Sequence, residues 1–251
     1  MYKIDLNSDL GEGALFDADI IPLITSANVA CGFHAGGCTL MKKTVELCKS
    51  NSVFFGAHPG YPDRENFGRT NMDVTPEQVY EYTLYQLGAL GAFAKANGVK
   101  MSHVKPHGAM YNMAAKNAEL SNAIVDAVKD YDDSLILLAL SGSEMIKAAK
   151  SKGIKYASEV FADRAYESDG TLRARKLEGS MITDENEAIN RVIRMIKEGK
   201  VTSYTGEDID IEAHSVCVHG DGEKALDFVH ALNKAFVENG IKTAPLSEVI
   251  G

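Results

Sequence analysis

The sequence lacks tryptophan, contains only four cysteines and has no long apolar run. The cysteines form no C-x-x-C pair, and a chain of 251 residues does not need disulfides to stabilise its core, so they are predicted to be reduced thiols. The longest uninterrupted apolar stretch, residues 135–140, is far too short to span a bilayer. We expect no secretory signal peptide, because the N-terminal residues lack the basic segment followed by an apolar segment that is typical of one. These absences predict a cytoplasmic protein.

A surplus of positive charge is also missing. Lys and Arg together number 26, and Asp and Glu number 35, so the formal net charge is −9. This balance argues against the basic surface of a nucleic-acid-binding protein, and anionic membranes would repel it. The apolar fraction of 45% and the charged fraction of 24% are ordinary for a globular protein and exclude a disordered chain. We therefore expect a small-molecule ligand, with neither nucleic acid nor membrane as a partner.

Short apolar runs alternate with amphipathic segments along the whole chain, and no repeat or proline-rich linker interrupts them. The predicted strands are residues 3–7, 25–30, 52–57, 101–104, 135–140, 154–160, 214–220 and a short segment after residue 240. The predicted helices are residues 38–50, 75–97, 109–130 in one or two pieces, 143–152, 183–198 and 222–239. Strands that alternate with helices of this length are typical of right-handed βαβ units and a parallel sheet.

The number of these units and the chain length favour one α/β architecture. Single β/α barrels commonly have about 250 residues. We therefore predict a single domain over residues 1–251, an irregular parallel β/α barrel that is TIM-like and has seven or eight strands. An open, doubly wound sheet is the alternative.

Histidines fall at similar topological positions. Four of the seven follow a predicted strand within a few residues: His34, His58, His107 and His219. The other three lie within or at the start of an element and are assigned no role: His103, His214 and His230. Residues just beyond the carboxyl ends of parallel barrel strands converge on one face, where such enzymes place their chemistry. The sequence therefore predicts one pocket that collects these distant imidazoles.

The first predicted strand carries polar side chains on one side. Alternation along the strand places Asp5, Asn7 and Asp9 on one side and Leu6 on the other, and Glu12 follows. Polar groups that face a barrel interior are costly unless they bind each other or a ligand. They indicate either a hydrogen-bonded polar plug or a platform of oxygen ligands for a metal or substrate, and we favour the second.

Five further segments place candidate residues after strands. Residues 28–37 start with Asn28 and are rich in glycine, but no Walker loop occurs in the chain. Residues 56–63 form a stiff, proline-containing loop that leads to Arg69, which could clamp a carboxylate. The next segment supplies Lys105, His107 and Tyr111. Another supplies Asp163 beside Arg164, and in the last segment Asp221 follows His219.

These blocks, taken in order, resemble the LamB/YcsF family. They are DLNSDLGE from Asp5, ACGFHAG, GAHPGYPD with FGR, VKPHGAMYN, EVFADRAY and CVHGD, which ends at Asp221. The combination is very specific, although no single block is. The resemblance implies an irregular β/α barrel related to polysaccharide-deacetylase-like and glycosidase-like barrels. It also implies ATP-dependent opening of the 5-oxo-L-proline lactam to L-glutamate by the A subunit of a 5-oxoprolinase, together with partner subunits B and C.

A lactam is a poor electrophile, and phosphorylation of its amide oxygen gives an imidate that water can attack. Because the chain lacks a nucleotide loop, we expect subunits B and C to supply ATP activation while this barrel binds oxoproline and directs the water. The catalytic candidates are Asp9, Glu12, His34, His58, Lys105, His107 and Asp163. The substrate-binding candidates are Asn7, Asn28, Arg69, Tyr111, Arg164, His219 and Asp221. Asp9, Glu12 or a histidine would be the general base, and Lys105, Arg69 or Arg164 would neutralise carboxylate or phosphate oxygens.

The sequence departs from the family pattern at a few positions, and two alternatives stay open. Gly37 stands where family members usually carry an acid, Thr70 replaces the second arginine of FGRR, and Gly222 with Glu223 follows the last block. One alternative is a metal-dependent amide hydrolase or deacetylase whose divalent ion is held by Asp9, His34 and His58. The other is a non-catalytic sensing subunit that lost its acid at position 37.

Overall fold

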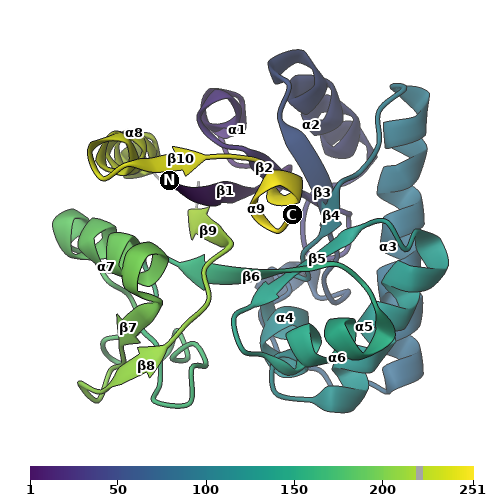
Figure 1. The fold of residues 1–251 in the computed structure, drawn as a ribbon. Helices are drawn as coiled ribbons and strands as arrows, with labels where there is room; N and C mark the ends of the chain where they lie inside the picture. Colours follow the sequence, from purple (N-terminus) through teal and green to yellow (C-terminus); the bar gives the residue numbers. More distant parts are fainter. Residues whose placement is uncertain (219–222) are drawn as a thin grey trace.

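Seven parallel strands close into a barrel in the computed structural model, which describes residues 1–218 and 223–251. They are β1 (Tyr2–Leu10), β2 (Ser26–Ala30), β3 (Phe54–His58), β4 (His103–Val104), β5 (Ile136–Leu140), β6 (Tyr156–Phe161) and β9 (Ser215–Val218). Strand β9 pairs with both β6 and β1 and so completes the ring (Figure 1). An eighth strand, β10 (Ile241–Thr243), pairs with the start of β1. The closed ring confirms the predicted irregular parallel barrel and excludes an open sheet.

Helices surround the barrel, as Figure 1 shows. The longer ones are α2 (Cys38–Asn51), α3 (Pro76–Ala96), α4 (Gly108–Ala114), α5 (Ala118–Tyr131), α6 (Glu144–Lys152), α7 (Glu185–Glu198) and α8 (Glu223–Glu238). The segment predicted as one or two helices forms two, α4 and α5. Short helical turns are α1 (Asp17–Ile20), α9 (Leu246–Val249) and two 3-10 turns, Ile21–Leu23 and Arg64–Asn66. Within the described part of the chain, no helix is long and apolar enough to cross a membrane.

Local sequence explains where α3 begins. The Thr75 side chain accepts a hydrogen bond from the Gln78 backbone, and the Gln78 side chain accepts one from the Thr75 backbone. These two bonds satisfy donors that the first helical turn leaves free, and Pro76 needs no such partner. The side chains of Asn117 and Asp184 accept hydrogen bonds from backbone N–H groups in the first turns of α5 and α7. The predicted starts of α3 and α7 therefore lie close to the observed ones, whereas no separate start was predicted for α5.

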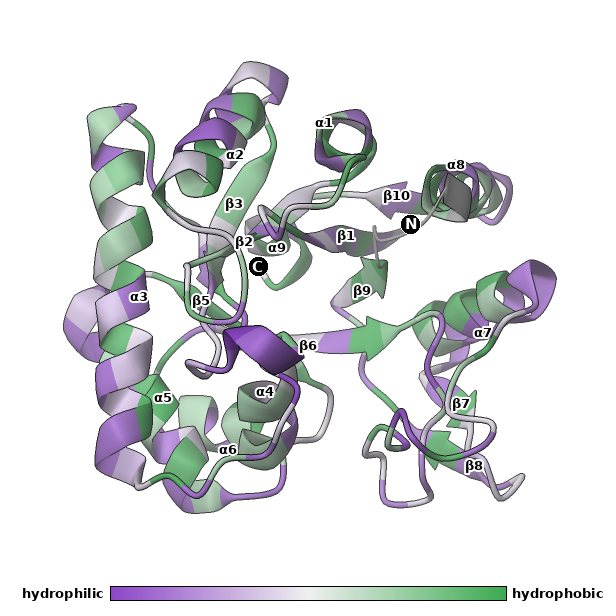
Figure 2. Cartoon of the chain, turned by 180° about the vertical axis from the view of Figure 1, so that it is seen from behind, coloured by the Kyte–Doolittle hydropathy of each residue, from purple (hydrophilic) through white to green (hydrophobic). Residues whose placement is uncertain are grey.

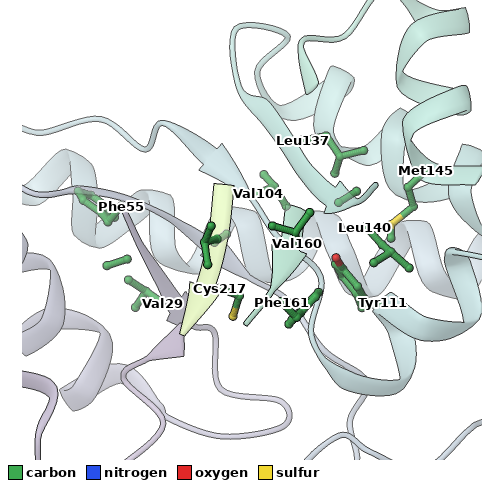
Figure 3. Close-up of a cluster of buried hydrophobic side chains, with 14 of the residues drawn as sticks. Val29, Phe55, Val104, Tyr111, Leu137, Leu140, Met145, Val160, Phe161 and Cys217 are labelled. Carbon is green, nitrogen blue, oxygen red and sulfur yellow. The ribbon is translucent and has the colours of Figure 1, made fainter. Parts of the chain in front are cut away.

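The main apolar core lies between the outer side of the barrel and the helices. Val29, Val104, Leu137 and Val160 are fully buried there (Figure 3). Strand alternation turns these side chains outward and their neighbours inward. Helices such as α2 and α7 carry both hydrophobic and hydrophilic residues (Figure 2), which suits packing on a barrel with one side in water.

The barrel interior differs at its two ends. At the N-terminal end, Leu246 of α9 packs with Ile136, Leu138 and Ala157 in a small apolar cluster. Above this cluster, buried Asp5 accepts hydrogen bonds from the hydroxyls of Ser26 (2.6 Å), Thr25 (2.6 Å) and Ser215. Burial raises the pKa of the Asp5 carboxyl from 3.8 to about 6, although the hydrogen bonds oppose the rise. Asp5 therefore belongs to a polar plug, while the ligand platform lies further along β1.

The substitution Asp5→Asn is expected to remove a pH dependence of stability. The folded chain holds the Asp5 proton up to about pH 6, whereas the unfolded chain releases it near pH 3.8. The free energy of unfolding therefore falls by up to about 3 kcal/mol as the pH rises between these values. The variant lacks this contribution. Urea denaturation of both proteins from about pH 4 to pH 7 gives the free energy of unfolding at each pH. The same change with pH in the two proteins would contradict the prediction.

An antiparallel hairpin, β7 (Lys200–Thr202) with β8 (Asp208–Asp210), was not predicted. Its two strands are short and contain few apolar residues, so the alternation that indicates a strand is weak. The hairpin projects from the barrel below α7 in Figure 1 and contacts the loop that follows β6. In that contact the Tyr204 backbone donates a hydrogen bond to the Tyr166 carbonyl at 2.7 Å.

Candidate functional site

The carboxyl ends of four neighbouring strands bring the predicted acids and imidazoles together. Asp9 lies in β1 and Glu12 follows it, while His34 follows β2 and His58 ends β3. His107 comes shortly after β4 and directly precedes α4. The three histidines are almost fully buried. The topology thus brings together three of the four histidines for which the sequence predicted one pocket.

Four of these residues form a compact group, which we call the histidine cluster: Glu12, His34, His58 and His107. Their ligand atoms all lie within 4.8 Å of one another. Glu12 Oε1 lies 3.0 Å from His34 Nε2, 3.5 Å from His107 Nδ1 and 3.8 Å from His58 Nε2. The rings of His34 and His107 stack with centroids 3.7 Å apart.

Backbone carbonyls fix which ring nitrogens carry protons. His58 Nδ1 lies 2.6 Å from the Lys105 carbonyl, and His107 Nε2 lies 2.8 Å from the Phe67 carbonyl. A carbonyl oxygen only accepts, so both nitrogens must donate. The other nitrogens, His58 Nε2 and His107 Nδ1, lie 3.0 Å apart. If both rings were neutral, two lone pairs would face each other. The arrangement therefore calls for one positive charge between them.

A proton on His58 satisfies this requirement. Burial alone would lower the pKa of His58, but the charge and hydrogen bond of Asp9, helped by Glu12, raise it above its usual value of 6.5. Burial and the charge of His58 lower the pKa of His34 to about 2 and hold that of His107 well below 6.5. One histidine is thus charged and two are neutral.

A metal ion fits the same position. Neutral imidazoles with a carboxylate suit zinc and similar borderline ions, and carbonyls that orient the outer ring nitrogens are the usual supporting contacts. This group of possible metal ligands differs from the predicted one, which consisted of Asp9, His34 and His58. Glu12 and His107 complete the observed group, while Asp9 Oδ2 lies 3.4 Å from His58 Nε2. Asp9 stands outside the group because its other oxygen binds a lysine and an amide.

That lysine is Lys105, which is buried beside two carboxylates. Its ammonium lies 2.9 Å from Asp9, 2.8 Å from Glu159 and 3.2 Å from Cys217 Sγ. Burial alone would lower the pKa of Lys105, but Asp9, Cys217 and Glu159 together hold it well above 10.5. Lys105 is therefore a permanent cation whose charge its neighbours already balance, and it fixes their positions.

Glu159 is a site residue that the motif reading missed. It lies inside β6 with no exposed surface. Its carboxylate accepts hydrogen bonds from Asn7 Nδ2 at 3.0 Å and from the Tyr111 hydroxyl at 2.7 Å, besides its contact with Lys105. A charged residue inside a predicted buried strand was the available signal, because such a group needs partners.

A second missed residue, His103, extends the network below the site. Asn28 donates to Asn7 Oδ1 at 2.7 Å and to Asp9 Oδ1 at 2.8 Å, and its own oxygen lies 2.8 Å from His103 Nε2. Burial and the charge of Lys105 lower the pKa of His103 to about 3, so the ring is neutral and donates this bond. Asn7 and Asn28 therefore position Asp9 and Lys105 and do not line the cavity above them.

The site opens into a cavity of about 980 Å³. Its lining includes Asp9, Glu12, His58, Lys105, His107, Arg69, Tyr111, Arg164, Phe161, Leu140 and Arg175. Three of these lining residues, Tyr111, Phe161 and Leu140, lie close to one another in Figure 3. Asp163, half-buried next to Arg164, is not among the lining residues. The predicted residues His219 and Asp221 lie outside the described residues.

Comparison with known proteins identifies the family. The model of the LamB/YcsF family matches residues 4–251. The chain belongs to the LamB/YcsF family. A Clostridium beijerinckii protein named as the A subunit of 5-oxoprolinase is 55% identical to this LamB/YcsF chain over 254 residues, covering 99% of it and 100% of the relative.

Solved structures agree with this LamB/YcsF assignment. A lactam utilization protein from Thermus thermophilus has 41% identity and a TM-score of 0.89, with 96% of this chain and 98% of that chain covered. A T48 deacetylase solved with substrate has 12% identity and a TM-score of 0.54, with 99% and 90% covered. The second likeness concerns the fold alone, and it agrees with the expected deacetylase-like barrel.

Proposed function

We propose that this chain is the A subunit of an ATP-dependent 5-oxoprolinase and that its barrel binds 5-oxo-L-proline and directs the water that opens the lactam. Relatives of full length that are named as the A subunit of 5-oxoprolinase support the assignment. The observation that carries it is a cavity lined by Glu12, His58 and His107 beside a cationic wall, with the buried His34 in contact with Glu12. Proton transfer and carboxylate binding need these two kinds of group.

Glu12 is the general base in this proposal. Both Asp9 and Glu12 line the cavity, but Asp9 is held by Lys105 and Asn28. Glu12 instead lies against all three histidines of the cluster. Glu12 takes a proton from water, the water oxygen bonds to the activated amide carbon, and the C–N bond then breaks. His58, charged in the resting site, can return a proton to the leaving nitrogen. Because ATP has placed a phosphoryl group on the amide oxygen, this step gives an acyl phosphate. A second water then releases phosphate and leaves the side-chain carboxylate of glutamate.

Partner subunits B and C supply that activation in our proposal. The chain contains no Walker loop, and the name of its relatives implies further subunits. We place the complex in the cytoplasm, where the four cysteines, all free in the structure, stay reduced.

The test is reconstitution. The chain is assayed alone and together with subunits B and C, and ATP-dependent release of glutamate from 5-oxoproline is measured. We expect turnover only in the complete mixture. Full turnover by the chain alone would reject the division of labour. No turnover in any mixture, with each subunit shown to be folded, would reject the function.

A metal-dependent amide hydrolase is the second candidate, because the histidine cluster fits a divalent ion. Such an ion, held by Glu12 and the three histidines, would polarise the amide carbonyl. Metal analysis of the purified protein, followed by chelation, separates the two candidates. Stoichiometric metal and loss of activity on chelation support the ion, whereas full activity in a metal-free sample rejects it.

Gly60→Ala is expected to lower turnover about 100-fold without unfolding the chain, because displacing a catalytic group by about 1 Å can have this effect. A Cβ at Gly60 would lie 2.6 Å from His34 Nδ1 and would push the imidazole away from Glu12. The matched control is Gly88→Ala on α3, where a Cβ meets nothing within 4 Å. The control should keep its activity, and an equally active Gly60→Ala enzyme would contradict the prediction.

A further inference from the structure

An exposed arginine, Arg64, reaches the loop that carries His34. Arg64 lies in the 3-10 turn between β3 and α3. Its Nη1 donates a hydrogen bond to the Gly32 carbonyl at 3.0 Å, and its Nη2 donates one to the Gly36 carbonyl at 2.6 Å. These two carbonyls lie on either side of His34 in the chain. The planar, rigid guanidinium binds both at once, so it holds this segment before and after His34.

His34 depends on this loop more than the other two imidazoles of the histidine cluster do. The outer ring nitrogens of His58 and His107 are each held by a backbone carbonyl. His34 is neutral and its Nε2 lies 3.0 Å from Glu12 Oε1, so Nε2 carries the proton and donates a hydrogen bond to the carboxylate. Its other nitrogen, Nδ1, is buried and has no hydrogen-bond partner among the residues that the structure describes. The position of this ring is therefore set by its backbone and by packing.

The loop that Arg64 holds also lies against the turn before Glu12. A Cβ added at Gly36 would lie 2.6 Å from the Gly11 carbonyl, so the two backbones are in close contact. The turn at Gly11, with its φ of +71°, directs Glu12 toward the histidines. A displacement of the loop at Gly36 would therefore change both sides of the contact between His34 and Glu12.

The turn that carries Arg64 is itself fixed, and it holds His107 as well. The Asp63 carboxylate accepts hydrogen bonds from two groups of the same segment, at 2.7 Å and 3.1 Å. Phe67 adopts a φ of +56°, which is uncommon for a residue with a Cβ, and its carbonyl accepts the hydrogen bond of His107 Nε2. Backbone strain of this kind is concentrated at functional sites. Arg64 therefore joins a well-held turn to the loop after β2.

We propose that Arg64 is a positioning residue, which holds the loop after β2 so that His34 stays in hydrogen-bond contact with Glu12. The catalytic role of Glu12 in this statement rests on the proposed function. Arg64 is not among the residues that line the cavity, so it acts through the loop and not on the substrate. A surface arginine that only added stability would have no specific effect on the orientation of His34, and this difference can be measured.

The first measurement is kinetic. Arg64→Gln is expected to lower kcat of the reconstituted enzyme about 10- to 100-fold, because displacement of a catalytic group by about 1 Å can lower turnover about 100-fold. KM for 5-oxoproline should change much less, since the cations that line the cavity remain in place. Arg64→Lys keeps the charge but not the planar pair of donors, and it should retain more of kcat than Arg64→Gln does.

The second measurement needs neither partner subunits nor turnover. Nitrogen NMR of the histidine rings reports which ring nitrogen is protonated and hydrogen-bonded, and the His34→Gln variant assigns the His34 signals. In the chain alone, Arg64→Gln should shift the His34 signals, whereas the signals of His103, buried in the network below the site, should stay unchanged. If Arg64→Gln fails to fold, Arg64→Lys should show a smaller shift of the His34 signals in a folded chain.

The matched control is Lys49→Gln. Lys49 is also an exposed cation that binds a backbone carbonyl, that of Asn97 at 2.8 Å. It lies in the last turn of α2, which leads to the start of β3 and so to the opposite end of the barrel from the site. This variant should leave both kcat and the His34 signals unchanged.

A folded Arg64→Gln chain with unchanged His34 signals would overturn the inference. Shifted His34 signals without a lower kcat would do the same, and so would an equal shift at His103, which would indicate a general structural change. If the complex of unchanged subunits shows no turnover, the proposed function fails, whereas the NMR measurement still tests whether Arg64 positions His34.

Discussion

Replacing Lys105 with methionine is expected to lower the free energy of unfolding by about 3–5 kcal/mol, the usual effect of breaking a buried ion pair by removing one partner. The ammonium lies between Asp9 and Glu159, and the Glu159 side chain has no exposed surface. Methionine fills similar space but removes the positive charge that lies beside the buried Glu159 and that Asp9 shares with His58. We also expect turnover to be lost, because Asp9 would no longer be held beside His58. Urea denaturation and the glutamate-release assay measure the two effects.

Two comparisons separate this effect from a general loss of lysine. Lys147→Met removes an exposed lysine that pairs with Glu144, and it should change stability by less than about 1 kcal/mol. The double variant Lys105→Met with Glu159→Gln should regain part of the lost stability, because one unbalanced carboxylate becomes a neutral amide. Glu159→Gln alone provides the reference. If Glu159→Gln lowers the free energy of unfolding of the Lys105→Met variant by as much as it lowers that of the unchanged chain, Glu159 is not coupled to Lys105.

The order of strands and helices could be predicted because periodicity records which side of an element is buried. The run at residues 135–140 indicates a strand covered on both sides, and β5 is such a strand, with Leu137 packed outward and Leu138 packed inward. The β7–β8 hairpin could not be predicted in this way, since most of its side chains face solvent. Its position depends on contacts such as Tyr204 with Tyr166, which link distant parts of the chain.

The site could be predicted in outline for a topological reason. Parallel strands bring His34, His58 and His107 to one end of the barrel whatever the details of the loops. The sequence could not decide whether Asp9 or Glu12 joins them, because both follow or end the first strand. The turn at Gly11, with a φ of +71°, directs Glu12 toward the histidines, and the Asn28 contact holds Asp9 next to Lys105.

Replacing Glu12 with glutamine is expected to lower kcat of the reconstituted enzyme about 10²- to 10⁴-fold, the usual contribution of a general base. Glutamine has nearly the same shape and keeps one carbonyl oxygen near His34, but it cannot take a proton from water. The cavity cations that would bind the substrate are unchanged, so KM should change much less than kcat. Steady-state kinetics with 5-oxoproline and saturating ATP measure both constants.

The matched control for Glu12 is Glu46→Gln on α2, an exposed residue that pairs with Lys42 and should leave kcat unchanged. Metal content distinguishes the two roles that the cluster allows. If Glu12 only moves protons, the variant and the unchanged chain carry the same amount of metal, whereas a ligand role predicts a loss of bound metal in parallel with kcat. A Glu12→Gln enzyme with full kcat would exclude both roles and would leave Asp9, whose Oδ2 lies 3.4 Å from His58 Nε2, as the carboxylate in contact with the imidazoles.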